Sequence, residues 1–380
     1  MGSRSTQYAT AATEMTLTPV MTLQSQEDSG WIGSMAYFPD GKRIISVNFD
    51  EPIRQWDLQA GKVIKVRDIY GGNIDLSDVS RDGRWVMTSE GGYGEYKEVK
   101  AYEVETGIVK TFQHSRQIRC LDISADGKLL ANGSYFDRTV LIWSVDTGEL
   151  VAGPFKSHDG VDAVRFSPDS KKLAVRSKLY RCLEVWDVQT QKLDARVGKE
   201  DKFVPILWTN KGTILAVFNF LEDDPHLKPM TIYEFDASTL ETVGDPFEGH
   251  TDPINDLAFS SDRTVLASHS IDNTIKLWFI EPRQLLASFH VQHDLVSIIF
   301  SPDTRQLASC TYDQIVIYNI PPDILASIRI APDARATVRI CCIYLIVDVL
   351  ISSSRSVHLT IQPSTSYSMC SPHCSIHLHY

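Results

Sequence analysis

Hydrophobic and polar residues alternate along most of the chain in short runs that predict β-strands. One group reads INDLAF at 254–259, TVLASHS at 264–270 and TIKLWF at 274–279, with apolar residues at about every second position. Such alternation, rich in β-branched residues and bounded by Gly, Pro, Asp and Asn, is typical of half-buried strands. No stretch keeps a helical period of useful length. The pattern therefore predicts an all-β protein.

The strand groups recur with two marks that share one period. The first is a hairpin turn of the PDG type, centred on positions 40, 82, 126, 169, 211, 262 and 303, all Asp except the fifth. The second is an aromatic residue late in each group: Trp56, Tyr102, Trp143, Trp186, Phe235, Trp278 and Tyr318. The aromatic marks are 46, 41, 43, 49, 43 and 40 residues apart. Two independent marks with one period predict seven repeated units.

A period of 40–45 residues with four strands and a Trp-Asp mark, as at Trp56-Asp57, resembles the WD40-repeat family. The resemblance covers residues 17–320 and implies a seven-bladed β-propeller of four-stranded antiparallel blades. In that family a hydrogen-bonded tetrad locks the blade. It carries over to the sixth unit as His250, Ser268, Asp272 and Trp278.

The other units depart from this tetrad pattern. Asp28 stands where the first unit would have its His, and the second and fifth units have no Trp at the mark. His114 and His158 precede the first strand of their units and are expected at the tetrad position, while His290 and His293 compete for it in the seventh. We interpret these His and Trp residues as structural, because buried ring N–H groups need partners.

The two ends of the chain are expected to differ in role. The last unit stops after its third strand, so the segment PVMTL at 19–23 is expected to supply the fourth and to close the ring, as the resemblance implies. Residues 1–16 are expected to be disordered. Residues 321–380 lack Lys, Glu, Gly and Trp and hold ten Ser, four His and four of the seven Cys. We interpret them as a low-order tail, with a gene-model artefact as the alternative.

The tail suggests neither a membrane span nor a metal site. Its apolar run at 340–351 is shorter than the about 20 residues that a spanning helix needs. Its potential zinc ligands follow no recognisable spacing: Cys370, His373, Cys374, His377 and His379.

Composition narrows the partners and the compartment. The chain has 380 residues with 37 Lys and Arg against 48 Asp and Glu, a net charge of −11. This argues against a nucleic-acid groove and against attraction to an acidic membrane. The seven Cys are too few for a disulfide scaffold, and the N-terminus shows no apolar secretory segment. We expect an intracellular protein, cytoplasmic or nuclear, with no stable membrane anchor; its oligomeric state stays open.

No common catalytic motif occurs in the chain. There is no G-x-S-x-G, no H-E-x-x-H and no Gly-Lys followed by Ser or Thr. We therefore predict a non-enzyme with no catalytic, cofactor or metal residues. Two alternatives stay open: an enzyme or small-ligand receptor that uses the central channel, and a substrate receptor of a ubiquitin ligase. The second is disfavoured because Trp56-Asp57 and Trp186-Asp187 are not followed by Arg or Lys.

Candidate binding residues come from the loops that the propeller would place on one face. The second and fifth units carry inserts between their second and third strands, at 90–98 and 219–229. The candidates from the inserts are Tyr93, Tyr96, Phe220, Leu221, Asp223, Asp224 and His226, and those from loops between blades are Trp31, Arg116 and Asp159. Asp223 and Asp224 favour a basic peptide or protein. The sequence thus predicts a protein-interaction scaffold; long loops that are merely tolerated are the alternative.

Overall fold

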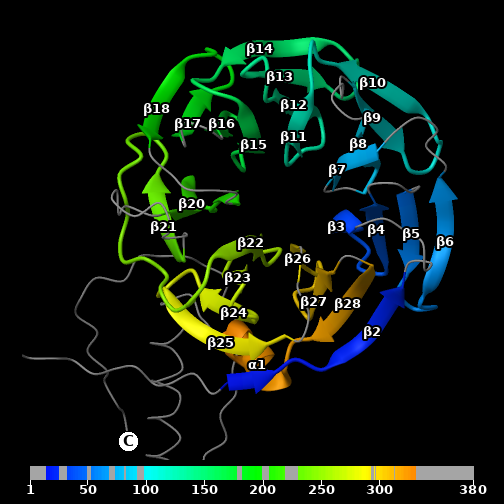
Figure 1. The fold of residues 1–380 in the computed structure, drawn as a ribbon, viewed down its shortest axis with the longest axis vertical. Coiled ribbons are helices and arrows are strands. Elements are labelled where there is room, and N and C mark those ends of the chain that lie inside the picture. Colours follow the sequence, from blue (N-terminus) through cyan, green and yellow to red (C-terminus); the bar gives the residue numbers. More distant parts are fainter. Residues whose placement is uncertain are drawn as a thin grey trace, which may run out of the picture. The chain divides into compact units, whose positions relative to one another are not determined.

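Seven antiparallel sheets stand around a central axis and form a closed ring (Figure 1). The computed structural model describes residues 14–24, 32–48, 53–67, 73–80, 83–91, 98–177, 182–198, 205–218, 230–291, 295, 297–311 and 313–330. The innermost strand of each sheet contacts that of the next, and the seventh contacts the first. The predicted seven-bladed propeller is confirmed.

Each blade runs outward from its inner strand in chain order. Blade one holds β3 (Ile32–Tyr37), β4 (Arg43–Asn48), β5 (Ile53–Asp57) and β6 (Lys62–Arg67). Blade two holds β7 (Asn73–Val79), β8 (Trp85–Gly91), β9 (Glu98–Glu103) and β10 (Val109–Gln113). Blade three holds β11 (Ile118–Ile123), β12 (Leu129–Ser134), β13 (Thr139–Ser144) and β14 (Leu150–Lys156). Blade four holds β15 (Val161–Phe166), β16 (Lys172–Ser177), β17 (Cys182–Asp187) and β18 (Leu193–Gly198).

The remaining three blades follow the same order. Blade five holds β19 (Ile206–Trp208), β20 (Thr213–Phe218) and β21 (Thr231–Asp236). Blade six holds β22 (Ile254–Phe259), β23 (Val265–Ser270), β24 (Thr274–Phe279) and β25 (Gln284–His290). Blade seven holds β26 (Ser297–Phe300), β27 (Gln306–Cys310) and β28 (Gln314–Asn319).

An N-terminal strand completes blade seven. β2 (Pro19–Gln24) pairs antiparallel with β28, with Leu23 opposite Ile315. Leu23 is 1% exposed and packs in the core shared by blades seven and one. The predicted closure is confirmed, and it joins the start of the ring to its end by backbone hydrogen bonds.

The chain just outside the ring is more ordered than its sequence predicts. Residues 14–16, expected to be disordered, form β1 (Glu14–Thr16), which pairs parallel with β25 and gives blade six a fifth strand. The outer edge of β25 offers unpaired backbone groups that favour such an addition. Residues 322–330, expected to be of low order, form the helix α1 (Pro322–Ile330). A proline in its first turn and burial of Ile324 against blades six and seven stabilise it.

Blade five lacks a regular fourth strand. Only isolated bridges, between Ile232 and Phe247 and between Phe235 and Thr242, occupy that place among the described residues. Gly244 has a φ of +64°, and Pro246 carries no N–H to donate. The segment therefore turns away from the ladder, while Phe247 still fills the core.

The aromatic marks join neighbouring blades. Trp186 of blade four meets Phe155 of blade three edge to face, with ring centroids 5.8 Å apart. Trp278 of blade six meets Phe247 of blade five in the same way at 5.9 Å. Each of these marks thus packs on the outer part of the preceding blade.

Blade six holds a continuous hydrogen-bonded chain of four side chains. Trp278 Nε1 donates to Ser268 Oγ at 2.8 Å, and Ser268 Oγ lies 2.7 Å from His250 Nε2. His250 Nδ1 lies 2.8 Å from Asp272 Oδ2. Burial alone would raise the pKa of Asp272, but hydrogen bonds from His250 and Thr274 hold that pKa well below its ordinary value. The chain ties the loop before β22 to the turn between β23 and β24.

Blade three carries an incomplete version of this chain. His114 Nδ1 lies 3.4 Å from Asp137 Oδ2, and its Nε2 lies 3.3 Å from Thr139 Oγ1. Burial lowers the pKa of His114. Asn132 occupies the register position of Ser268. Within the described ranges, neither its side-chain amide nor Trp143 Nε1 has a hydrogen-bond partner.

Blade four uses a carboxylate instead. Val175 replaces the Ser, and Glu184 Oε2 accepts from Trp186 Nε1 at 3.1 Å. The fully buried Glu184 also accepts from Arg196 Nε at 2.8 Å and from the backbone N–H of His158 at 3.1 Å.

The expectation that His158 takes the tetrad position is wrong. Its side chain is exposed, whereas Ser157 lies four residues before β15, as His250 lies four before β22. Of the two residues expected to compete for the tetrad position of blade seven, His290 ends β25 of blade six with its side chain exposed, and His293 lies outside the described residues.

Asn132→Ser should complete the chain of blade three. A Ser hydroxyl there would accept from Trp143 Nε1, as Ser268 accepts from Trp278, so we expect the free energy of unfolding to rise by about 1 kcal/mol. Urea denaturation followed by tryptophan fluorescence measures it. The reverse change, Ser268→Asn, should lower the free energy of unfolding. An unchanged or lower stability of Asn132→Ser would contradict the role given to the missing Ser hydroxyl.

Glu184→Ala should be among the most damaging single changes in blade four. It leaves the buried Trp186 Nε1–H and the backbone N–H of His158 without their acceptor and removes the ion-pair partner of the partly exposed Arg196, so we expect a loss of about 3 kcal/mol in the free energy of unfolding. Denaturant unfolding checks this against Glu149→Ala, an exposed turn position. Equal stability of the two variants would refute the role given to Glu184.

The carboxylate of Asp272 should make stability depend on acid. Because its pKa is lower in the folded than in the unfolded chain, it stabilises the fold above its unfolded pKa of about 4, and this contribution is lost as the pH falls further. We expect Asp272→Asn to be less stable at pH 7 and to lose less stability on acidification than the parent chain. Thermal unfolding at a series of pH values measures it. Parallel profiles for the two proteins would exclude this contribution.

Candidate functional site

Antiparallel strands place two sets of connections at the same end of every blade. The connections from second to third strand and those from one blade to the next leave one end, here called the top face. The PDG-type hairpins and the turns between third and fourth strands lie at the other end. The tetrad residues His250 and Asp272 come from two top-face connections. The chain of hydrogen bonds in blade six therefore holds top-face loops in place.

Most of the binding residues expected from the sequence lie outside the described residues: Trp31, Tyr93, Tyr96, Phe220, Leu221, Asp223, Asp224 and His226. The flanking strands nevertheless put both inserts between second and third strands, in blades two and five. The insert of blade two is shorter than 90–98, because Glu90 and Gly91 end β8 and Glu98 begins β9.

Arg116 and Asp159 are described, and they differ in exposure. The Arg116 side chain is 67% exposed, and its Nε lies 3.5 Å from Asp137 Oδ1. The Asp159 side chain is only 2% exposed and lies 3.8 Å from Arg138 Nε. Asp159 is therefore too buried to contact a partner directly, which corrects the role expected from its loop position. It instead supports Arg138, across the boundary between blades three and four.

The turn between β12 and β13 is held from several sides. A Cβ on Gly160 would lie 2.5 Å from the Tyr135 ring, so that ring packs directly on the backbone of blade four. Asp137 accepts from the Ser115 hydroxyl, and Arg138 adopts a left-handed φ of 58°. Between these anchored residues Phe136 projects outward and is 54% exposed.

Blade six presents an apolar residue at the equivalent place. Ile271 precedes Asp272 as Phe136 precedes Asp137, and it is 48% exposed. Neither residue was predicted from the sequence as a binding residue, although each is an apolar residue directly before the Asp of the second-to-third-strand turn. Two large apolar side chains thus project from the top face, on blades that are three steps apart.

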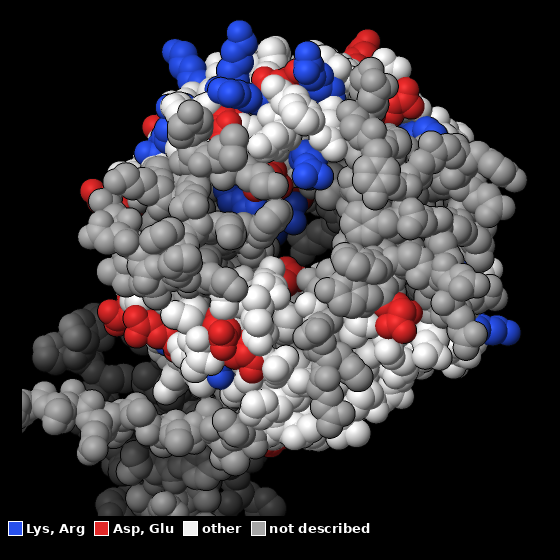
Figure 2. Space-filling model, viewed as in Figure 1, with Lys and Arg blue, Asp and Glu red and all other residues white. Residues whose placement is uncertain are grey.

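Basic side chains gather near blades three and four. Figure 2 shows Lys and Arg on the part of the ring that carries β11–β18 and inside it, beside β11 and β15. Across described residues 113–119, 134–139 and 156–161, the charged side chains that stay exposed are those of Arg116, Arg119, Arg138 and Lys156. The acids among them, Asp137 and Asp159, are mostly buried.

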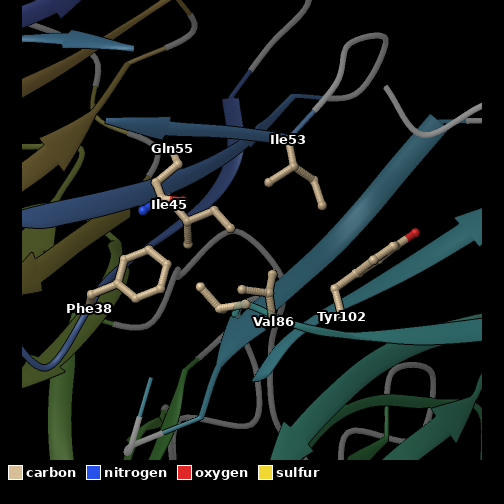
Figure 3. Close-up of a pocket in the computed structure, with 7 residues that line it drawn as sticks. Phe38, Ile45, Ile53, Gln55, Val86 and Tyr102 are labelled. Carbon is tan, nitrogen blue, oxygen red and sulfur yellow. The ribbon is translucent and has the colours of Figure 1, made fainter. Parts of the chain in front are cut away.

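The cavity between blades one and two is unsuited to a substrate. It encloses about 30 Å³, room for about one water molecule, and is lined by Phe38, Ile45, Ile53, Gln55, Val86 and Tyr102 (Figure 3). In the described part of the chain no three His, Cys, Asp or Glu side chains gather as metal ligands. None of the helices described is long and apolar enough to span a bilayer.

Comparison with known proteins points to one family. The profile of the family "WD domain, G-beta repeat" matches residues 107–144, 241–278 and 283–318. The chain is 27% identical to periodic tryptophan protein 2 of Arabidopsis thaliana over 215 residues, 56% of this chain and 23% of that protein. It is 28% identical to WD repeat-containing protein SL1-17 of Schistosoma mansoni over 239 residues, 57% of this chain and 73% of that protein.

A third relative is more distant. Eukaryotic translation initiation factor 3 subunit I of Drosophila ananassae is 23% identical over 192 residues, 50% of this chain and 59% of that protein. The chain therefore spans less than a quarter of the first relative and most of the second. Three matched repeats, WD-repeat relatives and a ring of seven blades agree, and the chain carries WD40 repeats on a seven-bladed propeller.

Proposed function

We propose that this chain is a non-catalytic scaffold or adaptor that binds other proteins through its top face. The observation that carries the proposal is the pair Phe136 and Ile271, exposed at equivalent turns of blades three and six. Large apolar side chains on a rigid surface are typical anchors of protein interfaces. The turns that carry them are held by His114 and Asp137 in blade three and by His250 and Asp272 in blade six.

The inserts of blades two and five connect second to third strands, as the turns of Phe136 and Ile271 do. We assign secondary contacts to Tyr93, Tyr96, Phe220, Leu221, Asp223, Asp224 and His226. Trp31, in the connection that precedes β3, belongs to the same set. No cofactor is predicted from the sequence. We propose that the protein binds its partners inside the cell.

The relatives support work within assemblies. One of them is by its name a subunit of a eukaryotic translation initiation factor, so that protein is part of a larger complex. We extend to this chain only that general mode of action, since the matched regions are half of the chain or slightly more.

The double variant Phe136→Ala/Ile271→Ala should lose partners without losing the fold. We expect both side chains to be anchors, so each truncation should weaken binding by about 1–2 kcal/mol. Quantitative co-purification of the full chain from its native cells, read by mass spectrometry, measures the loss. The matched control is Val109→Ala/Leu150→Ala, here called the rim variant. It truncates two side chains on the outermost strands β10 and β14, each 47% exposed.

Two results decide the proposal. Specific partners that are retained by the rim variant and lost by the top-face variant support it. Partners that persist in the top-face variant at parental levels, with both variants melting at the same temperature, would refute it.

A further inference from the structure

We propose that the top face of blades three and four binds an acidic peptide segment with an apolar residue at its centre. This inference rests on the proposed function and names the class of partner. The residues that carry it are Arg116, Arg138 and Phe136, with Arg119 and Lys156 beside them.

In the three described segments 113–119, 134–139 and 156–161, the exposed charged side chains are all basic. The side chains of Arg116 and Arg138 are 67% and 55% exposed, whereas those of Asp137 and Asp159 are 20% and 2% exposed. The two carboxylates therefore face inward, and solvent meets mainly guanidinium groups. Coulomb attraction at such a surface favours carboxylates of a partner and speeds their encounter.

Each arginine lies beside a carboxylate of the protein itself, which restricts its side chain. Arg116 contacts Asp137 through Nε at 3.5 Å, and Arg138 contacts Asp159 through Nε at 3.8 Å. The backbone of Arg138 is also fixed, because its carbonyl accepts from the Ser157 N–H at 2.8 Å. Side chains that are already positioned lose less conformational entropy on binding, so each new contact with a carboxylate contributes more.

Phe136 supplies the apolar contact at the same turn. It is 54% exposed and packs edge to face on Tyr135, with ring centroids 5.2 Å apart. Its neighbour Asp137 contacts Arg116, and Arg138 follows two residues after it. An apolar side chain on Phe136 would therefore be flanked by cations, which fits an apolar residue between acids.

The net charge of the chain favours a short acidic segment over nucleic acid. The chain carries −11 overall, so a long polyanion that extends past blades three and four would meet repulsion. A peptide of a few residues can stay within the basic surface. The acidic pair Asp223 and Asp224, which favours a basic partner, lies in the insert of blade five outside the described residues. The described surface has the opposite sign.

Fluorescence anisotropy with designed peptides tests this directly on the full chain. The probes are the fluorescein-labelled peptides EEELEEE, EEESEEE and KKKLKKK, together with an oligothymidylate strand of about 20 nucleotides. We expect EEELEEE to bind about tenfold tighter than either other peptide, with an affinity that falls as salt rises. Arg116→Glu/Arg138→Glu should weaken it about tenfold, and Phe136→Ala should remove the preference for Leu over Ser.

Matched controls separate this test from that of the proposed function. Lys128→Glu/Arg305→Glu makes the same charge change at exposed positions of the opposite face and should leave EEELEEE binding unchanged. Equal binding of acidic and basic peptides, no effect of Arg116→Glu/Arg138→Glu, or tighter binding of the oligothymidylate would overturn the inference. If cellular partners still depend on Phe136 and Ile271 in that case, the proposed function stands and only the partner class is wrong. If they do not, both fail.

Discussion

The pairing of β2 with β28 is the constraint on which the rest of the molecule depends. Each blade buries its faces against its neighbours, so an open row of seven would leave an apolar face uncovered at both ends. Closing the row into a ring covers both, provided that blade seven is complete. The chain completes it with its own N-terminal segment, and Leu23 carries that segment into the core between blades seven and one. Segments about 300 residues apart in sequence thus share one sheet.

Closure of the ring also explains how the blades can carry different side chains on the top face. Backbone pairing and aromatic contacts between blades hold the ring together. The buried side-chain hydrogen bonds within one blade can therefore differ from those in the next. Blade six uses Ser268, blade four uses the buried Glu184, and blade three leaves Trp143 Nε1 without a partner among the described residues. The turns above these chains then present different side chains, such as Phe136 and Ile271, on a common frame.

Most of the architecture follows from residue pattern, because period-two alternation and recurring turn residues report local structure. Seven units, the closing strand and the membership of His250, Ser268, Asp272 and Trp278 in one blade could all be predicted. Features that depend on which strands lie side by side could not be predicted from the sequence. Glu184 replaces a Ser on a different strand, and His158 misses the tetrad position by one residue. β1 forms only because the outer edge of β25 is available to it. Exposure of Phe136 and burial of Asp159 likewise depend on how blade three meets blade four.

Native-state hydrogen exchange followed by mass spectrometry tests the role of closure most directly. If β2 is an integral part of the ring, peptides that cover residues 19–24 will exchange only with the global unfolding that releases β23 and β24. Their protection will then fall in parallel with that of blade six as denaturant is added. Fast exchange of residues 19–24 while blade six stays protected would show that the ring holds without its closing strand, and would contradict the account.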